Sequence, residues 1–530
     1  MLRVDPELKQ KLIDPLFTPL DRSFKLSAGV LLALVAWGAF MYFRQVFLGL
    51  GVTGMGRPVY WSMYIVDFVF FIGISHAGTL ISAILRVTGA EWRRPITRVA
   101  EAITVFALIV GSMQILIDMG RIDRLAFTVI FGRLQSPIMW DIISVTLYLL
   151  GSVTYLFLPL MPDVAIIRDN LPDSVPAWRR QFYNILSLGW SGTKEQWVRL
   201  EKAIAFMAVF IIPVAVSVHS IISWILATTL QPGWHSTVFG PYFVAGAIFS
   251  GIGALFIAMT AVRKILGLEK YIAQKQYRNL GLIFITMNAI WFYFTFAENL
   301  GIATGQQTYE MPILATKLWG QFAPTFWLMI GCMAVAFYIL VVPSMLKKQT
   351  EEQRAFIFQP RFVSGSAIAV VVLTALLVAP NLISAPVLAI SDNAVVSTVL
   401  WTLLILSVFG LLLSVSQWLK ANPVTSTVIA SALVVVGMWL ERWNIIIPTV
   451  THPMLVPYAT YTPSLTEISI AIASLSGFLL MFLIFFKLFP AISIWELAEG
   501  SVIEEAQSSV VLPEPQSNDK RRWGFKSITR

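Results

Sequence analysis

Residues 203–227 read AIAFMAVFIIPVAVSVHSIISWILA, an apolar run without a single aspartate, glutamate, lysine or arginine. Folded as a helix, this run is long enough to cross the roughly 30 Å hydrocarbon layer of a membrane. The sequence contains eleven further runs of this kind. They lie near residues 27–48, 61–87, 99–119, 138–161, 240–262, 279–302, 320–343, 362–380, 395–416, 424–447 and 465–488. We therefore expect an all-α, polytopic transmembrane protein with about twelve spans, within a range of ten to twelve.

The overall composition agrees with a chain that lies mostly in lipid. Of the 530 residues, 57% are apolar and only 13% are charged, whereas an average soluble domain has about 25% charged residues. Mean hydropathy is +0.75. These values exclude a soluble enzyme, a nucleic-acid binder and a disordered scaffold, and the continuous apolar runs exclude a barrel of alternating strands. The single cysteine, Cys332, excludes a disulfide framework and an iron–sulfur cluster held by this chain alone.

Basic residues predict the orientation in the membrane. If the N-terminus is cytoplasmic, 31 of the 38 lysines and arginines fall in cytoplasmic segments and seven fall outside, as the positive-inside rule requires. We therefore expect a multi-pass protein of the inner (cytoplasmic) membrane with both termini in the cytoplasm. The chain divides into a cytoplasmic segment 1–26, a transmembrane domain 27–490 and an exposed, partly flexible polar tail 491–530.

Ionisable groups are costly inside lipid, so each one near a span is a candidate functional group. Most of them gather at the predicted outer ends of five spans. His76 is an outlier in the inner half of the second span. The outer groups are Asp118 and Arg121 after the third span, Asp141 behind Trp140 at the start of the fourth, His219 in the fifth, Glu298 in the seventh, and Glu441 with Arg442 in the eleventh.

These groups also have simpler interpretations. Asp118 and Asp141 could pair with nearby arginines at the membrane interface, and Glu441 and Arg442 could pair with a neighbouring helix. His76 lies about 22 Å below the outer end of its span and His219 within about 10 Å of the outer face, at 1.5 Å per residue. Two histidines at such different depths do not clasp one iron, so the sequence predicts no haem in this chain.

A cluster of carboxylates, a histidine and arginines at one face suits a neutral amphipathic molecule that gains or loses protons there. A quinol head group fits, because it arrives from lipid and needs a base for each hydroxyl proton that it loses. The electrons must then pass to the cofactor of a partner, since this chain is expected to bind none of its own.

Several stretches resemble the NrfD/PsrC family, the quinone-interacting membrane subunits of respiratory oxidoreductase complexes. The resemblance extends over about 25–497 and is closest to the larger NrfD-like subunit of alternative complex III. The matching stretches are FVFFIGISHAGTLISAIL (68–85), DMGR (118–121), QSPIMWD (135–141), LPLMPD (158–163), SVHSIIS (217–223), PGWHSTVFGPYFVAGAIFS (232–250) and WLERWNIII (439–447). Relative to that subunit, 362–416 looks like an insertion of two spans.

The resemblance implies two four-helix bundles with extra helices and a site for menaquinone or ubiquinone, as substrate, near the outer face. It also implies an iron–sulfur, ferredoxin-like subunit docked on that face, and further membrane subunits with catalytic or multihaem cytochrome subunits. In this interpretation Asp118, Asp141 and His219 manage the protons, and Arg121 and Trp140 complete the quinone site. A proton route inward would use His76, Glu298, Glu441 and Arg442.

Two alternatives remain. One is the membrane anchor of a molybdopterin oxidoreductase that reduces polysulfide, tetrathionate or a similar compound. The other is a secondary transporter, because twelve spans with both ends inside is a common transporter layout. A transporter should carry its charged groups near the midplane, between two repeated halves, whereas most charges here lie towards one face.

Overall fold

The computed structural model describes residues 9–345, 365, 367–373 and 394–497. Within these residues, ten helices are long and apolar enough to cross a membrane, and each coincides with one of the predicted runs. They are α3 (Arg22–Leu48), α4 (Met63–Val87), α5 (Arg94–Asp118), α7 (Pro137–Asp169), α9 (Lys194–Ala227), α10 (Phe239–Ile265), α11 (Gln274–Gly305), α13 (Ala323–Met345), α17 (Pro423–Thr451) and α18 (Leu465–Leu488). The chain is therefore an integral membrane protein made of helices, as the sequence predicts.

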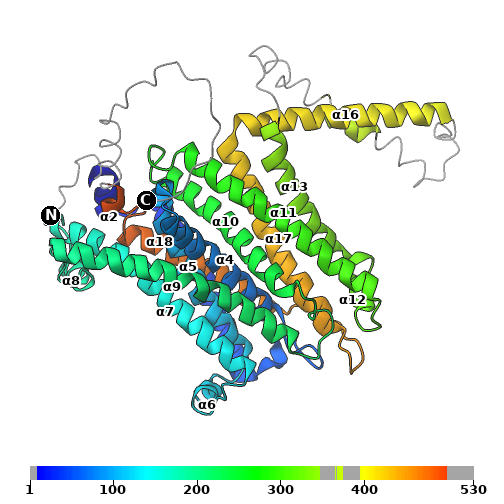
Figure 1. Cartoon of the computed structure of the whole chain (residues 1–530), viewed down its shortest axis with the longest axis horizontal. Coiled ribbons are helices and arrows are strands. Elements are labelled where there is room, and N and C mark those ends of the chain that lie inside the picture. Colours follow the sequence, from blue (N-terminus) through cyan, green and yellow to red (C-terminus); the bar gives the residue numbers. More distant parts are fainter. Residues whose placement is uncertain (1–8, 346–364, 366, 374–393, 498–530) are drawn as a thin grey trace, which may run out of the picture.

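The region of the predicted insertion is only partly described. The predicted span 362–380 lies largely outside the described residues, and the predicted span 395–416 falls within α16 (Ala394–Ala421). In Figure 1, α16 runs across the ends of α13 and α17 instead of alongside them. The assignment of 362–416 as an inserted pair of spans stays a prediction.

Eight of the ten spanning helices form two four-helix bundles. In bundle 1, each of α4, α5, α7 and α9 contacts two others, so that the four close a ring. In bundle 2, α10, α11, α13 and α17 close a ring in the same way. The bundles lie side by side because α10 packs on α4 and α9, and α17 also reaches α4. The remaining pair, α3 and α18, packs against α5 and α4.

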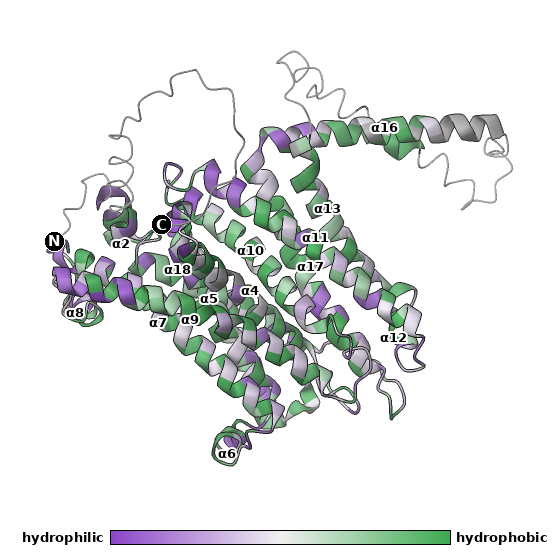
Figure 2. Ribbon diagram, in the orientation of Figure 1, coloured by the Kyte–Doolittle hydropathy of each residue, from purple (hydrophilic) through white to green (hydrophobic). Residues whose placement is uncertain are grey.

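The two ends of the bundles define two faces. The α8 face carries the short helices α2 (Asp14–Phe17) and α8 (Ala177–Leu186), and the α6 face carries α6 (Leu125–Ile130) and α12 (Met311–Leu318). Hydrophobic residues cover the lengths of the helices, and hydrophilic residues gather near α2 and α8 (Figure 2). The excess of basic residues predicts that the α8 face is cytoplasmic.

Local sequence signals explain where several helices begin. Capping boxes start α9 and α18: Thr193 and Gln196 bond reciprocally in the first, and Ser464 and Glu467 do so in the second. In each box two side-chain oxygens satisfy backbone N–H groups that the first helical turn leaves free. Proline occupies the first turn of α5, α7 and α17, where its missing N–H has no cost.

Helices α4 and α5 approach each other closely at Gly78. A Cβ atom added there would lie 2.0 Å from the carbonyl oxygen of Ala100 and 2.2 Å from Oγ1 of Thr104. Small residues that let backbones approach are typical of helix interfaces in membranes. The interface can therefore form in this way only with glycine at this position.

Gly78→Ala is expected to lower the free energy of unfolding by about 1–3 kcal/mol, because the added methyl group must push α5 away from α4. Thermal unfolding of the purified protein in detergent measures this loss. Gly281→Ala on α11 is the matched control, since nothing lies within 4 Å of a Cβ added at Gly281. Equal unfolding temperatures for the two variants would contradict the packing argument.

The chain beyond α18 turns back into the protein and seals the α8 end of bundle 1. Residues 489–496 are buried. The ring of Trp495 packs on Trp197 of α9, and its indole nitrogen donates to the carbonyl oxygen of Pro159 on α7. An exposed tail was expected from about residue 490, and that expectation is wrong for residues 490–496.

Candidate functional site

The centre of bundle 1 holds two buried histidines in direct contact. His76 of α4 and His219 of α9 are fully buried, and their ring centroids lie 4.0 Å apart. The ring of His76 also contacts Tyr148 of α7, whose hydroxyl donates to the carbonyl oxygen of Ser75. The predicted difference in depth between the two histidines is therefore wrong.

The reason is that the predicted outer ends of the two helices are not level. At 1.5 Å per residue, His76 lies about 20 Å from the first residue of α4 (Met63–Val87), and His219 lies about 12 Å from the last residue of α9 (Lys194–Ala227). Because the two rings are in contact, these two helix ends do not share one depth. Counting residues from the helix ends misplaces His219 relative to His76.

The two imidazoles have opposite hydrogen-bonding situations. Nδ1 of His76 lies 2.7 Å from the carbonyl oxygen of Ile72, and Nε2 of His76 contacts that of Ala215. Within the described part of the chain, both ring nitrogens of His219 are buried without a hydrogen-bond partner. A neutral imidazole has one donor, so His76 in that form donates to one of the two carbonyl oxygens at a time.

A buried ion pair lies where the two bundles meet. Arg442 and Glu441 of α17 are each about 1% exposed, and Nη1 of Arg442 lies 2.7 Å from Oε2 of Glu441. The guanidinium group stacks over Phe243 at 5.1 Å from the ring centroid. A Cβ atom added at Gly246 of α10 would lie 3.0 Å from Nη2 of Arg442, so glycine makes room for the guanidinium.

The ion pair connects the interiors of both bundles. On the bundle 2 side, the indole nitrogen of Trp291 donates to Oε1 of Glu441 at 2.6 Å. On the bundle 1 side, Phe243 contacts both Arg442 and the ring of His219, whose centroid is 6.4 Å away. The sequence predicted His219, Glu441 and Arg442 at the outer face. In the structure they belong to a chain of contacts that runs from the interior of bundle 1 into bundle 2.

The two aspartates of the predicted site lie at the α6 end of bundle 1. Asp118 is the last residue of α5, and Asp141 lies in the first turns of the neighbouring helix α7. Each is half-buried, and each has one buried carboxylate oxygen, Oδ1, without a hydrogen-bond partner among the described residues. Of the three predicted proton-active groups, His219 contacts His76 and Phe243 deeper in the bundle.

Two other predicted site residues point elsewhere. Arg121 is exposed and forms a bidentate pair with Asp123, with distances of 2.8 and 2.7 Å, in place of the expected pairing with Asp118 or Asp141. Arg121 and Asp123 are two residues apart on one loop, so they pair at the surface and neither side chain enters the protein. The indole nitrogen of Trp140 donates to the carbonyl oxygen of Leu134 at 2.6 Å and so fixes the loop before α7.

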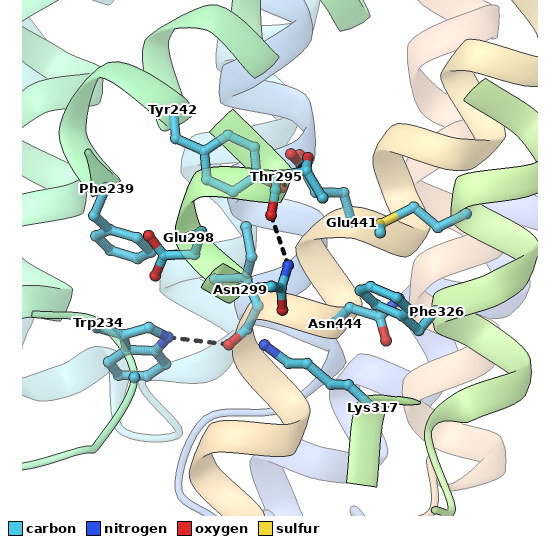
Figure 3. A pocket seen from close by; sticks show the side chains of 13 residues that line it. Trp234, Phe239, Tyr242, Thr295, Glu298, Asn299, Lys317, Phe326, Glu441 and Asn444 are labelled. Atoms are coloured by element: carbon cyan, nitrogen blue, oxygen red, sulfur yellow. Dashed lines mark hydrogen bonds between the residues drawn. The ribbon is translucent and has the colours of Figure 1, made fainter. Parts of the chain in front are cut away.

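A pocket opens at the α6 end of bundle 2 (Figure 3). Charged groups enter it from three helices: Glu298 from α11, Lys317 from α12 and Glu441 from α17. The hydroxyl of Ser236 donates to the carboxylate of Glu298. The other residues that line the pocket are Gly233, Trp234, Phe239, Tyr242, Thr295, Asn299, Phe326, Met329, Asn444 and Ile445. The sequence pattern indicates Glu298 and Glu441 as candidate groups but gives no sign of Lys317, which the packing of α12 brings to the same pocket.

The pocket changes the acidity of Lys317. Burial lowers the pKa of its ammonium group from 10.5 to about 8, against the attraction of the Glu298 carboxylate. Below about pH 8 the folded and unfolded chains both carry this proton, so the cost of burying the charge is fully present. Between about pH 8 and 10.5 the unfolded chain keeps a proton that the folded chain has lost, so this contribution to stability improves as the pH rises.

Lys317→Met is therefore expected to be more stable than the unchanged protein at pH 7.5, by a margin that shrinks at pH 9.5. Unfolding temperatures of both proteins in detergent at the two pH values measure the margin. A margin that stays constant or widens with pH would contradict the lowered pKa.

A second buried ionic cluster, which sequence analysis missed, lies at the α8 end of bundle 1. Nη2 of Arg98 on α5 lies 2.8 Å from Oδ2 of Asp163 on α7, and both side chains are almost fully buried. Oδ1 of Asp163 accepts the backbone N–H groups of Ile494 and Trp495 at 3.1 and 3.2 Å. Asp163 ends the motif LPLMPD, two residues after the predicted span 138–161 and inside α7, but no sequence signal shows that residues 494 and 495 return to it.

Glu496 ties the same segment to α4 and α5. Its carboxylate contacts Arg86 and lies 3.5 Å from Nη1 of Arg93, and its carbonyl oxygen accepts from Arg94 at 2.6 Å. Arginines that the positive-inside rule assigns to loops are therefore partly buried in this seal. These arginines therefore contact Glu496 inside the protein, in addition to their role in the orientation of the chain in the membrane.

The fold and these sites define a polytopic helical membrane protein with proton-active side chains inside both of its four-helix bundles. Residues 51–383, more than half of the chain, match the family model described as "Polysulphide reductase, NrfD". The protein belongs to the NrfD family.

Three relatives come from reductase and oxidoreductase complexes. The chain is 30% identical to a putative membrane subunit of dimethyl sulfoxide reductase from Halobacterium salinarum, over 60% of this chain and 69% of that protein. It is 24% identical to the Hdr-like menaquinol oxidoreductase integral membrane subunit of Archaeoglobus fulgidus, over 59% and 69%. It is 23% identical to a selenate reductase subunit from Mesobacillus selenatarsenatis, over 43% of this chain and 54% of that protein.

Proposed function

We propose that this protein is the quinone-interacting membrane subunit of a respiratory oxidoreductase complex in the cytoplasmic membrane. The observation that carries the proposal is the pair of aspartates, Asp118 and Asp141, on adjacent helices at the α6 end of bundle 1. Each leaves one buried carboxylate oxygen without a partner in the described part of the chain. A quinol hydroxyl group supplies the donor that such an oxygen lacks.

In this proposal the α8 face is cytoplasmic and the substrate is menaquinol or ubiquinol. Oxidation of one quinol releases two electrons and two protons. Asp118 and Asp141 accept the protons near the α6 face, while Trp140 shapes the loop beside them and Arg121 offers a charge at the rim. The electrons pass to a ferredoxin-like iron–sulfur partner on that face. The menaquinol oxidoreductase relative from Archaeoglobus fulgidus supports this assignment.

The buried line of polar groups supports a proton route through the interior of both bundles. His219 and His76 are in contact, and Arg442 joins them, across Phe243, to Glu441. We propose that protons move along these groups, with Glu298 at the end in bundle 2. Glu298 lines the pocket at the α6 end, so this route leads to the α6 face, whereas the sequence predicted a route inward. Each ring nitrogen of His76 faces a carbonyl oxygen, so a proton on either nitrogen has an acceptor.

Asp141→Asn in the assembled complex tests the quinol site. Loss of a general base costs about 10²–10⁴ in rate, so we expect at least a hundredfold lower quinol turnover. Glu269→Gln, an exposed carboxylate between α10 and α11, is the control and should turn over normally. Unchanged turnover together with unchanged binding of a quinol-site inhibitor in Asp141→Asn would remove this residue from the site.

A second candidate is the membrane anchor of a molybdopterin oxidoreductase. The dimethyl sulfoxide reductase and selenate reductase relatives favour it. The quinol site would be the same, but the electrons would flow to a catalytic molybdenum subunit that reduces an oxidised substrate. Purification of the native complex separates the two: molybdenum in the preparation supports the reductase, and multihaem cytochromes support a complex of the alternative complex III type.

A further inference from the structure

The pocket in bundle 2 is separate from the proposed quinol site. It lies between α10, α11, α12, α13 and α17, and neither Asp118 nor Asp141 lines it. Figure 3 shows Lys317 and Trp234 at one end of the pocket and Tyr242 and Glu441 at the other. Any function of this pocket is thus additional to quinol binding at the end of bundle 1.

The size of the pocket decides what it holds. The volume open to the centre of a water molecule is about 30 Å³, and one water needs a cavity that holds about one probe sphere of 10–15 Å³. The pocket therefore has room for ordered water. Its aromatic walls, such as Phe239 and Phe326, confine this water without competing for its hydrogen bonds.

The lining offers the partners that ordered water requires. The ammonium group of Lys317 donates, the carboxylates of Glu298 and Glu441 accept, and the amides of Asn299 and Asn444 do both. Oε2 of Glu441 faces the guanidinium of Arg442 but has no hydrogen bond of regular geometry within the described residues. Water usually makes about three hydrogen bonds to such groups, so the pocket is polar enough to be wet.

The deep wall of the pocket continues into the buried ion pair. Of the two glutamates that line the pocket, Glu441 is the one that contacts Arg442. The hydroxyl of Tyr242, from α10, lies 3.2 Å from Oγ1 of Thr295, and both residues line the same wall. A proton on Glu441 thus has the line of buried groups on one side and the pocket water on the other.

We propose that this pocket is the mouth through which the buried ion pair exchanges protons with water at the α6 face. The ligand is water and the proton that it carries, and the step is a proton transfer between pocket water and Glu441. Lys317 and Glu298 hold the water at the entrance. Glu298 from α11 is the charged group that acts on Lys317, and Glu441 from α17 and Tyr242 from α10 are the other titratable groups that line the pocket. The proposal rests on the proton route under Proposed function, and the lowered pKa of Lys317 agrees with a group that gives up its proton easily.

Chemical labelling tests the mouth without any enzyme activity. In a Cys332→Ala background, Lys317→Cys should react with a small, charged methanethiosulfonate reagent added to the α6 face of sealed vesicles. The control is Ile313→Cys on the same helix, which is fully buried and does not line the pocket. We expect labelling at least tenfold faster at position 317. Equal rates would overturn the proposal, because the pocket would then be closed to water.

Proton release tests the function of the mouth in the reconstituted complex. With a pH-sensitive dye on the α6 face, Lys317→Met and Glu298→Gln should release protons at least threefold more slowly, whereas Glu269→Gln should match the unchanged complex. Normal proton release in both pocket variants would overturn the proposal. If the unchanged complex does not oxidise quinol, the proposed function fails, and the labelling result still decides whether the mouth exists.

Discussion

Replacing Arg442 with leucine is expected to lower the free energy of unfolding by about 3–5 kcal/mol. The substitution leaves the carboxylate of Glu441 buried between the two bundles without its cation, and breaking a buried ion pair from one side carries a cost of this size. The stacking of the guanidinium on Phe243 is lost as well. Unfolding of the purified protein in detergent, by heat or by sodium dodecyl sulfate, measures the change.

The matched control is the double variant Glu441→Gln, Arg442→Leu, which removes both charges together. Exchange of a buried pair for uncharged groups is often nearly neutral, so the double variant should recover most of the loss. A double variant that is no more stable than Arg442→Leu would show that the charge pairing contributes little, and that the guanidinium acts only by filling space beside Gly246.

The second large effect is expected at the α8 end of bundle 1. Asp163→Ala leaves Arg98 buried without its carboxylate and removes the acceptor of two backbone N–H groups at residues 494 and 495. We expect a loss of about 3–5 kcal/mol and faster amide exchange over residues 489–497. Hydrogen–deuterium exchange with mass spectrometry measures the second effect directly.

Asp169→Ala on the same helix is the control for this variant. Asp169 pairs with its neighbour Arg168 at 2.9 Å, and both side chains are more than a fifth exposed. Pairs of this kind contribute about 0–1 kcal/mol. Equal protection of residues 489–497 in both aspartate variants would mean that Asp163 does not hold the segment in place.

The sequence was sufficient for the spanning helices, because an apolar run of about twenty residues has few alternatives to a membrane helix. It also located the groups at the ends of α5 and α7. It could not locate groups that depend on how far each helix extends beyond its neighbours. His76 and His219 illustrate this limit, since a depth counted from helix ends assumes that all the ends are level.

Another error came from treating charges as markers of solvent. Glu496 was expected in an exposed tail, but three arginines around it make its burial favourable. Arg121 was predicted to complete the quinone site, and in the structure it pairs at the surface with Asp123, which is closer along the chain than either aspartate of the site. Which charged groups pair with each other depends on how the helices pack, and the local sequence does not show that packing.

The seal formed by residues 489–497 also sets an order of events during biosynthesis. Asp163 is translated 331 residues before Ile494, its partner, which corresponds to about 17–66 s at 5–20 residues per second. Throughout that interval the spanning helices enter the bilayer while Arg98 and Asp163 still lack the segment that closes over them. Translation must therefore continue beyond α18 before bundle 1 can reach its final stability. A chain terminated before codon 489 would be fully inserted but would lack the seal.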